Sequence, residues 1–394
     1  MKKASIQHVI LFALIFLSVL LTSLTPSFAS DPIRIGILTE LTGYGADLGA
    51  AAKEGVNLAV EEINNNGGLL GRIVEAVFRD DESKPPKGIV AVRELIYAKK
   101  VEVVLGPTFT TVNFAILPVI NEAKIINLTL ATGTAIINLK NNPYTFRTNF
   151  YSKIEAETVI DYAIGQKGYR KVAIIHDSSG YGKAGLAELV PQLKNKGITP
   201  LTIQTYNIGD KNMTGQLLKI KQTGAEAILA WGLSPDMAAV AKNMNTLGLD
   251  LPVFGGSGLT SRFFKQLAGD TGKNFLGSMI KSFTFNKNNP MPKDASRYMD
   301  EMTKRHGLNR ESSLSNSGAW YDTVYVYARA VEAAGSADRE KVKAALENLR
   351  YKGLTGEIVF SPTDHEALES KDMTLVYCTA RFPEGQFGRP DDLN

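Results

Sequence analysis

The sequence predicts an α/β protein in which two lobes of similar design are each built around a parallel-rich β-sheet. Apolar strand-like runs alternate with amphipathic helix-like runs from residue 33 to residue 254. This alternation is typical of parallel sheets covered by helices. The runs fall into two series that meet near residue 150. A length of 394 residues is enough for two or three domains.

The first unit of this pattern occupies residues 33–71. A β-branched run at 33–38 predicts a buried strand, and a glycine-rich turn follows at 42–49. A helix then runs to an asparagine and glycine segment at 64–68, whose residues tolerate the left-handed conformation common after a helix. This is the first half of a right-handed βαβ unit, in which the loop after the strand faces the ligand crevice.

The rest of the first series repeats the unit. Helices are expected from Pro85 onward and in a short segment ending at Ala123. Further strands are expected at 73–78, 101–105 and 125–130. Residues 144–149 are expected to connect the first series to the second.

The second series begins with a helix at 152–167, for which Ser152 and Glu155 have the spacing of a capping box. The other expected helices are 183–196, 214–223 and 234–247, and the expected strands are 171–175, 198–206, 227–231 and 251–254. Beyond Phe283 the pattern changes. It predicts a polar loop at 286–292, helices at 292–305, 319–334 and 339–349, strands at 353–360 and 374–382, and a loose tail at 383–394.

The first 29 residues have the features of a cleavable signal peptide. Lys2 and Lys3 precede an apolar segment at 9–21 that is short for a membrane span. Ser27 and Ala29 are small residues at the positions that a signal peptidase requires, so cleavage is expected after Ala29. The alternative is an uncleaved signal anchor. No later stretch is apolar enough to span a bilayer, which predicts an exported, soluble chain.

Composition and charge exclude several classes of protein. A hydrophobic content of 44% and a charged content of 21% are ordinary for a globular protein. The net charge is +4 and the charges are interspersed, so no nucleic-acid partner is expected. The single cysteine, Cys378, cannot form an internal disulfide, lies too far from the signal peptide to carry a lipid anchor, and is expected to be buried.

Loops at strand ends are the candidate binding elements. The N–H groups and the dipole at the helix N-termini that follow these loops favour an anionic group. Thr110, Thr111 and Thr132 add hydroxyl donors on two adjacent loops, and a carboxylate is the ligand group that suits them. The alternative is that these threonines only cap the helices that follow.

Enzymatic alternatives have weaker support. The glycines at 43–49 approach a dinucleotide-binding pattern, and the acidic residues 80–82 follow the next strand, as in an exported oxidoreductase. The spacing differs by one residue from the common form. The segment 255–259 lacks the final glycine of a nucleophile elbow. The 4 histidines are scattered, His176 is expected to be hydrogen-bonded at a strand end, and no cluster has metal-ligand spacing. No catalytic residue, metal or cofactor is therefore expected.

Several motifs carry a family resemblance over nearly the whole mature chain. They are Gly-Ile-Leu at 36–38 with Leu-Thr-Gly at 41–43, and the segments 59–71, 80–81, 105–107, 176–182, 321–325 and 354–360. In this order and spacing, the chain resembles the exported solute-binding proteins of ABC importers, of the branched-chain amino acid (leucine/isoleucine/valine)-binding family.

The resemblance implies a type I periplasmic binding protein fold, with two Rossmann-like lobes joined by three crossover strands at a hinge. Lobe 1 would contain residues 31–150 and 284–374, and lobe 2 residues 151–283 and 375–394. The lobes would close around a small carboxylate or amino acid and present it to an ABC permease in the inner membrane. The resemblance also implies a monomeric protein of the periplasm.

The same resemblance implies the site residues. Thr110 and Thr132 match positions that bind the carboxylate and amine region of the ligand, and Tyr181 matches an aromatic residue that closes over it from lobe 2. Thr108, Phe109 and Leu130 would form the floor, and Leu48, Trp231 and Leu233 would face the ligand side chain. Simple packing roles are the alternative for Tyr181 and Trp231.

One position departs from the family pattern. Amino-acid-binding members have a glutamate where this chain has Ser257. A buried ammonium group without an opposing carboxylate costs several kcal/mol. Asp177 and Asp236 are candidate substitutes. Ser257 therefore raises an alternative ligand, an amine-free carboxylate such as an aromatic acid. A further alternative is a ligand sensor for a separate receptor.

Overall fold

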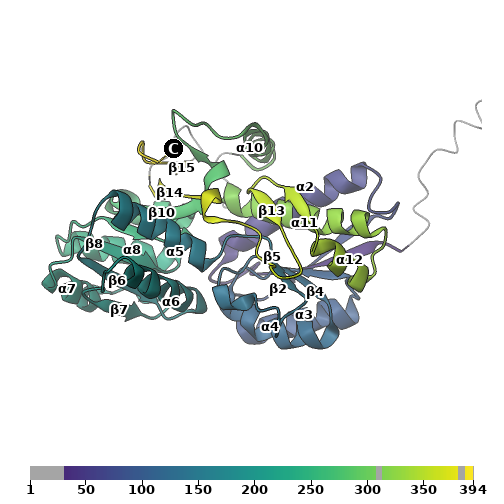
Figure 1. Cartoon of the computed structure of the whole chain (residues 1–394), viewed down its shortest axis with the longest axis horizontal. Helices are drawn as coiled ribbons and strands as arrows, with labels where there is room; N and C mark the ends of the chain where they lie inside the picture. Colours follow the sequence, from purple (N-terminus) through teal and green to yellow (C-terminus); the bar gives the residue numbers. More distant parts are fainter. Residues whose placement is uncertain (1–30, 308–312, 380–386, 394) are drawn as a thin grey trace, which may run out of the picture.

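The computed structural model describes residues 31–307, 313–379 and 387–393. Figure 1 shows two lobes side by side, each with a sheet between layers of helices. Within these described ranges, no helix combines the length and the apolar character needed to cross a membrane. The expected signal peptide lies outside them.

The first lobe contains a five-stranded sheet of order β2-β1-β3-β4-β5, with parallel neighbours throughout. Its strands are β1 (Ile33–Thr39), β2 (Val74–Asp80), β3 (Val103–Leu105), β4 (Ile126–Thr129) and β5 (Thr145–Arg147). Ile33, Ile35 and Ile37 of β1 face one hydrophobic core, and Leu38 faces the other. This alternation explains why both faces of the sheet are covered by helices.

Helices cover the two faces in pairs. The helices α2 (Ala46–Asn65) and α11 (Leu314–Ala334) pack together on one face, with α12 (Arg339–Leu346) beside α11. The helices α3 (Pro85–Arg93) and α4 (Thr110–Ala123) pack together on the other, below the sheet in Figure 1. The first lobe therefore combines an N-terminal βα series with helices from the C-terminal part of the chain.

The second lobe contains a six-stranded sheet of order β14-β10-β9-β8-β6-β7. Only its edge strand β14 runs antiparallel to its neighbour, β10. The strands are β6 (Val172–Asp177), β7 (Ile203–Tyr206), β8 (Ala227–Trp231), β9 (Val253–Gly255), β10 (Phe275–Ile280) and β14 (Met373–Tyr377). The helices are α5 (Ser152–Ile160), α6 (Gly180–Asn195), α7 (Thr214–Gln222), α8 (Ser234–Thr246) and α9 (Arg262–Ala268).

The remaining elements lie near the junction and on the first lobe. The helix α10 (Lys293–His306) stands above the junction in Figure 1. The short strand β11 (Thr284–Phe285) pairs with β15 (Phe387–Gly388). A hairpin is formed by β12 (Arg350–Lys352) and β13 (Glu357–Val359). The chain passes between the lobes three times: between β5 and α5, between β10 and β11, and before β14. The lobe boundaries expected from the sequence stay a prediction.

Several local expectations were wrong. The expected connection at 144–149 contains β5, and β10 was not expected at all. Ser152 is the first residue of α5 and does not cap it, because the residue before the helix is Tyr151 and no side chain caps this end. Glu155 therefore forms no capping box. Its side chain points into the second lobe, where it accepts hydrogen bonds from Ser257 and Ser278.

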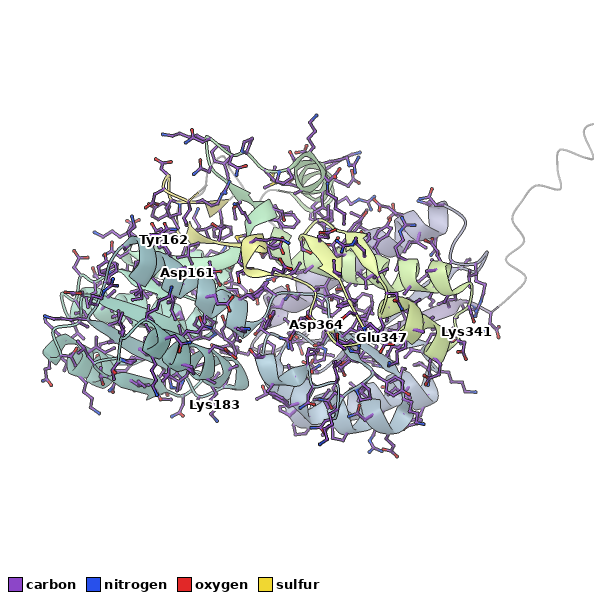
Figure 2. The ribbon with its side chains drawn as sticks, in the orientation of Figure 1. Asp161, Tyr162, Lys183, Lys341, Glu347 and Asp364 are labelled. Carbon is purple, nitrogen blue, oxygen red and sulfur yellow. The ribbon has the colours of Figure 1, made fainter. Side chains whose placement is uncertain are left out.

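The tail is not loose where the structure describes it. Phe387 and Arg389 are buried, and the backbone N–H of Arg389 donates to Phe285 at 2.8 Å. The hydroxyl of Tyr162, labelled on the second lobe in Figure 2, donates to Asp392 at 3.2 Å. Because β15 supplies a pairing strand for β11, the tail gains contacts that its composition does not indicate. Cys378 is buried, as expected.

Candidate ligand-binding site

The candidate site is a cavity between the two lobes. It contains about 940 Å³ of empty space, a figure that includes its open mouth. Its walls come from the loops after β1, β3 and β4 of the first lobe and from the loops after β6, β8 and β9 of the second. These loops follow the carboxyl ends of parallel strands, where ligands bind in open α/β sheets.

The helices that begin at this cavity include α4, α6 and α8. Thr110 and Thr111 open α4, Ser179 precedes α6, and Ser234 and Pro235 open α8; all of them line the cavity. The N-terminus of a helix carries unpaired N–H groups and a partial positive charge. The cavity is therefore approached by positive helix ends from both lobes, among them α4 from the first lobe and α6 and α8 from the second.

The two helices of the second lobe already have acidic partners. The carboxylate of Asp177 accepts from the N–H of Ser179 at 2.9 Å, in front of α6. Asp236 lies in the first turn of α8 and accepts from the N–H of Gly209 at 3.1 Å. These contacts offset the positive charge of both helix ends.

The N-terminus of α4 has no such partner among the described residues. No side chain caps this helix, and its first turn contains no acidic residue. Thr110 is nearly buried, and its hydroxyl oxygen accepts from the N–H of Gly133 at 3.2 Å, so its hydrogen remains available to a ligand. Thr132, 8% exposed, lies on the adjacent loop after β4, next to Gly133. This end of the cavity is suited to an anionic group.

The second lobe contributes an aromatic wall. The ring of Tyr181 lines the cavity, and its hydroxyl oxygen accepts from the N–H of Gly258 at 3.2 Å. The same hydroxyl lies 3.5 Å from that of Ser257. Burial raises the pKa of Tyr181 well above its ordinary value, and the Glu155 carboxylate adds to the rise. Tyr181 is therefore a neutral hydrogen-bonding group at every relevant pH.

The cavity brings together nine of the ten site residues expected from the sequence. They are Leu48, Thr108, Phe109, Thr110, Leu130, Thr132, Tyr181, Leu233 and Ser257. Their position around one cavity agrees with the expected arrangement, and their contact with a ligand stays a prediction.

Trp231 is the exception. It is fully buried behind Tyr181, with the two ring centres 5.9 Å apart, and it does not line the cavity. The expected position facing the ligand is therefore wrong. Alternation along β8 places Trp231 on the same sheet face as Ala227 and Leu229, toward the core under α6. A β-carbon on Gly185 of that helix would lie 2.2 Å from the indole.

Other lining residues were missed. Tyr44 and Asp47 belong to the glycine-rich loop, next to the expected Leu48, so their place in that loop was an available signal. Met279 and Ile280 end β10, a strand that the sequence analysis did not include. Ser315 and Asn316 come from the start of α11, far along the chain, and no local pattern points to them.

The two acids named as candidate substitutes for the missing glutamate, Asp177 and Asp236, do not line the cavity. Both oxygens of Asp177 accept hydrogen bonds, one from Ser179 and one from the N–H of Leu233 at 3.2 Å. Asp236 is held by Gly209. The acid nearest to Ser257 is instead Glu155, whose carboxylate accepts from the N–H of Ser257 at 2.7 Å.

The residues that suggested enzymatic chemistry, Asp80 and His176, form hydrogen bonds that stabilise local structure. Asp80 accepts from the N–H and the hydroxyl of Thr42, at 3.2 and 2.5 Å, so it closes the glycine-rich loop. His176 is hydrogen-bonded at its strand end, as expected, with Asp177 at 2.8 Å and Thr205 at 3.0 Å. In the part of the chain that the structure describes, no group of three or more acidic, histidine or cysteine side chains is placed to hold a metal ion.

Known proteins resemble this chain over almost its full length. A Leu/Ile/Val-binding protein homolog of Brucella melitensis is 29% identical over 350 residues, which covers 88% of this chain and 92% of the relative. The substrate-binding protein of a Streptococcus pneumoniae branched-chain amino acid transporter, solved with isoleucine, has a TM-score of 0.77 at 22% identity, with 91% of this chain and 100% of that chain covered.

A third similar protein was solved with a different ligand. It is an ABC-transporter solute-binding protein of Rhodopseudomonas palustris BisB5, in complex with 3,4-dihydroxybenzoic acid. It has a TM-score of 0.77 at 20% identity, with 88% of this chain and 93% of that chain covered. At such identities the two structures establish the fold, with two lobes and parallel-rich sheets, and do not establish the ligand.

The family model of the periplasmic binding proteins matches residues 32–382. This match spans both sheets and every loop around the cavity. The relatives named above are solute-binding proteins, and the family works with ABC transporters in the periplasm. This chain belongs to the periplasmic binding protein family.

Proposed function

We propose that this protein binds a small carboxylate between its lobes in the periplasm and delivers it to an ABC importer. The observation that carries the proposal is the N-terminus of α4, which opens on the cavity without an acidic partner among the described residues. The hydroxyls of Thr110 and Thr132 lie beside it. A carboxylate placed there would receive N–H and O–H donors and the favourable end of the helix dipole.

The first candidate ligand is a branched-chain or related amino acid. The names of the Brucella relative and of the Streptococcus structure support this class. Leu48, Leu130 and Leu233 give the cavity apolar walls that suit an aliphatic side chain.

The second candidate ligand is an aromatic acid without an amine. Ser257 stands where amino-acid-binding members have a glutamate, and Phe109, Phe263 and Met279 also line the cavity. The R. palustris structure with a dihydroxybenzoic acid supports this class. The same fold can thus bind either class of ligand. Whether a negative charge lies near Ser257 determines whether the ligand carries an ammonium group.

A thermal-shift screen of the purified mature chain tests the proposal. Each amino acid is paired with its amine-free analogue, and benzoic acids are added. A ligand at a hundred times its Kd stabilises the folded state by about 2.7 kcal/mol. A shift of the Tm with at least one carboxylate is expected. If no carboxylate shifts the Tm and a neutral solute does, the proposed role of α4 is wrong.

Transport is tested in the cell. Deletion of the gene is expected to abolish high-affinity uptake of the ligand, and the chain is expected to act as a monomer with a separate permease. A ligand sensor is the alternative role, in which uptake would continue and a ligand-dependent response would be lost.

A further inference from the structure

Glu155 is a buried carboxylate that the sequence pattern assigned to helix capping. It lies on α5, is fully buried, and contacts the loop that carries Ser257. One oxygen, Oε1, accepts from the N–H of Ser257 at 2.7 Å and from the hydroxyl of Ser278 at 2.8 Å. The other oxygen, Oε2, is buried and receives no hydrogen bond.

Among the side chains that the structure describes, none forms an ion pair with Glu155. Arg147 is the nearby basic residue that interacts with it electrostatically, but the guanidinium of Arg147 is paired with Glu366 at 2.9 Å. A buried carboxylate in this state either binds a proton or requires a positive charge nearby.

The cavity begins on the other side of Ser257. Ser257 and Tyr181 both line it, and both interact with the Glu155 carboxylate. Glu155 itself is not a lining residue. A cationic group of a ligand beside Ser257 would therefore lie one residue away from the unpaired carboxylate, in a region of low dielectric where such an attraction is strong.

We propose that Glu155 is the specificity-determining acid of this site and that it favours a ligand with an ammonium group next to its carboxylate. The ligand carboxylate lies at α4, and the ammonium group lies at Ser257, which accepts a hydrogen bond from it while Glu155 supplies the negative charge. The inference rests on the proposed carboxylate site and selects the amino-acid class within it. Glu155 acts through Ser257 and is a positioning residue in this arrangement.

The protonation state of Glu155 is expected to depend on which class of ligand is bound. Burial raises the pKa of Glu155, while the N–H of Ser257 and the hydroxyl of Ser278 oppose the rise. A zwitterionic ligand stabilises the ionised carboxylate. An amine-free acid requires the protonated form, because two like charges would otherwise be buried close together.

The test is Glu155→Gln, which removes the charge and keeps an oxygen that can accept from Ser257. Titration calorimetry compares leucine with 4-methylpentanoate, its amine-free analogue, and valine with 3-methylbutanoate. We expect the affinity for the amino acids to fall at least tenfold and the affinity for the amine-free acids to stay equal or rise. The matched control is Glu157→Gln, two residues along α5, whose carboxylate accepts from Ser370 outside the cavity.

A purely structural role would weaken both ligand types by the same factor in Glu155→Gln, and that result overturns the inference. Ser257→Ala gives a second test if Glu155→Gln does not fold, and it is expected to lower the preference for the amine in the same way. Wild-type protein that binds only amine-free acids overturns the inference and leaves the proposed carboxylate site intact. Wild-type protein that binds no carboxylate overturns both.

Discussion

The hydroxyl of Thr132 is expected to donate a hydrogen bond to the ligand carboxylate. Thr132 lines the cavity beside the start of α4, and the residue is 8% exposed. Its carbonyl oxygen accepts from the N–H of Ser152 at 2.8 Å, so the backbone here is fixed independently of the hydroxyl. A hydrogen bond to a charged group contributes about 1.5–3 kcal/mol.

Thr132→Ala is therefore expected to weaken ligand binding at least tenfold and to leave the Tm of the free protein nearly unchanged. Thr134→Ala is the matched control, because Thr134 lies two residues along the same loop and does not line the cavity. Calorimetry on both variants measures the effect. Equal affinities in Thr132→Ala and wild-type protein would remove Thr132 from the site.

Two substitutions of Tyr181 distinguish the role of its ring from the role of its hydroxyl. The residue lines the cavity, and the hydroxyl oxygen accepts from the partly buried N–H of Gly258. Tyr181→Phe is expected to lower the free energy of unfolding by about 0.5–1.5 kcal/mol, because the hydrogen bond to that N–H is lost. Tyr181→Ala also removes the ring and is expected to weaken binding at least tenfold. Denaturant unfolding and calorimetry measure the two effects, and similar affinities in both variants would show that the ring makes no contact with the ligand.

At the scale of elements, Asp322 ties α11 to the loop between β12 and β13. It is fully buried and accepts from the N–H groups of Leu354 and Thr355, at 2.9 and 2.8 Å, and from the hydroxyl of Thr355 at 2.6 Å. Burial raises the pKa of Asp322 from 3.8 to about 6, although these hydrogen bonds lower it. The folded state thus binds a proton more tightly than the unfolded state.

The sign of the pH dependence follows from this difference. Between about pH 4 and pH 6 the folded state binds more protons at Asp322, so the stability that this group contributes falls as the pH rises. Denaturant unfolding of wild-type protein and Asp322→Asn from pH 4 to pH 7 measures it. The wild-type free energy of unfolding, minus that of the variant, is expected to fall by up to about 3 kcal/mol. Parallel curves would show that Asp322 does not titrate in this range.

The sequence predicted the elements that have strong local patterns. β1, α2 and the strands and helices of both series form where apolar spacing and glycine stops indicate them. Family motifs then predicted nine residues around one cavity. Trp231 was misplaced although the alternation along 227–231 puts it on the face of Leu229, so a stricter use of period two would have corrected it.

Other features depend on contacts between distant segments. Glu155 has the spacing of a capping residue, but its carboxylate binds Ser257 and Ser278, more than one hundred residues away. The tail pairs with β11 over a similar distance along the chain. No window of local sequence contains both partners of such contacts, so local patterns cannot predict them.

At the scale of the whole molecule, the arrangement of the lobes places helix ends from both sides on one space. The N-terminus of α4 belongs to the first lobe, and the N-termini of α6 and α8 belong to the second. The ends of α6 and α8 already have the acidic partners Asp177 and Asp236, so the end of α4 is left for an anion. A carboxylate held at α4 in a ligand that also contacts Tyr181 of the second lobe would favour the closed arrangement more than the open one, which is the condition for a ligand to shift the population.

Gly180 provides the test of this closure. It opens α6, and a β-carbon on it would lie 3.1 Å from Cγ2 of Thr111 and 3.2 Å from Cγ2 of Thr110, both in the first lobe. Its backbone conformation does not require glycine. Gly180→Val is thus expected to leave each lobe folded, to hold the lobes apart, and to weaken ligand binding at least tenfold.

Gly215→Val is the matched control, because Gly215 also lies in the first turn of a helix, α7, and a β-carbon there would have open space around it. Small-angle scattering is expected to show a ligand-induced decrease in the radius of gyration for wild-type protein and Gly215→Val, and no decrease for Gly180→Val at saturating ligand. A normal decrease together with normal affinity in Gly180→Val would mean that the ligand-bound lobes do not approach each other at α4 and α6. The lobes would then close through other contacts, and the ends of α4 and α6 would have no part in closure.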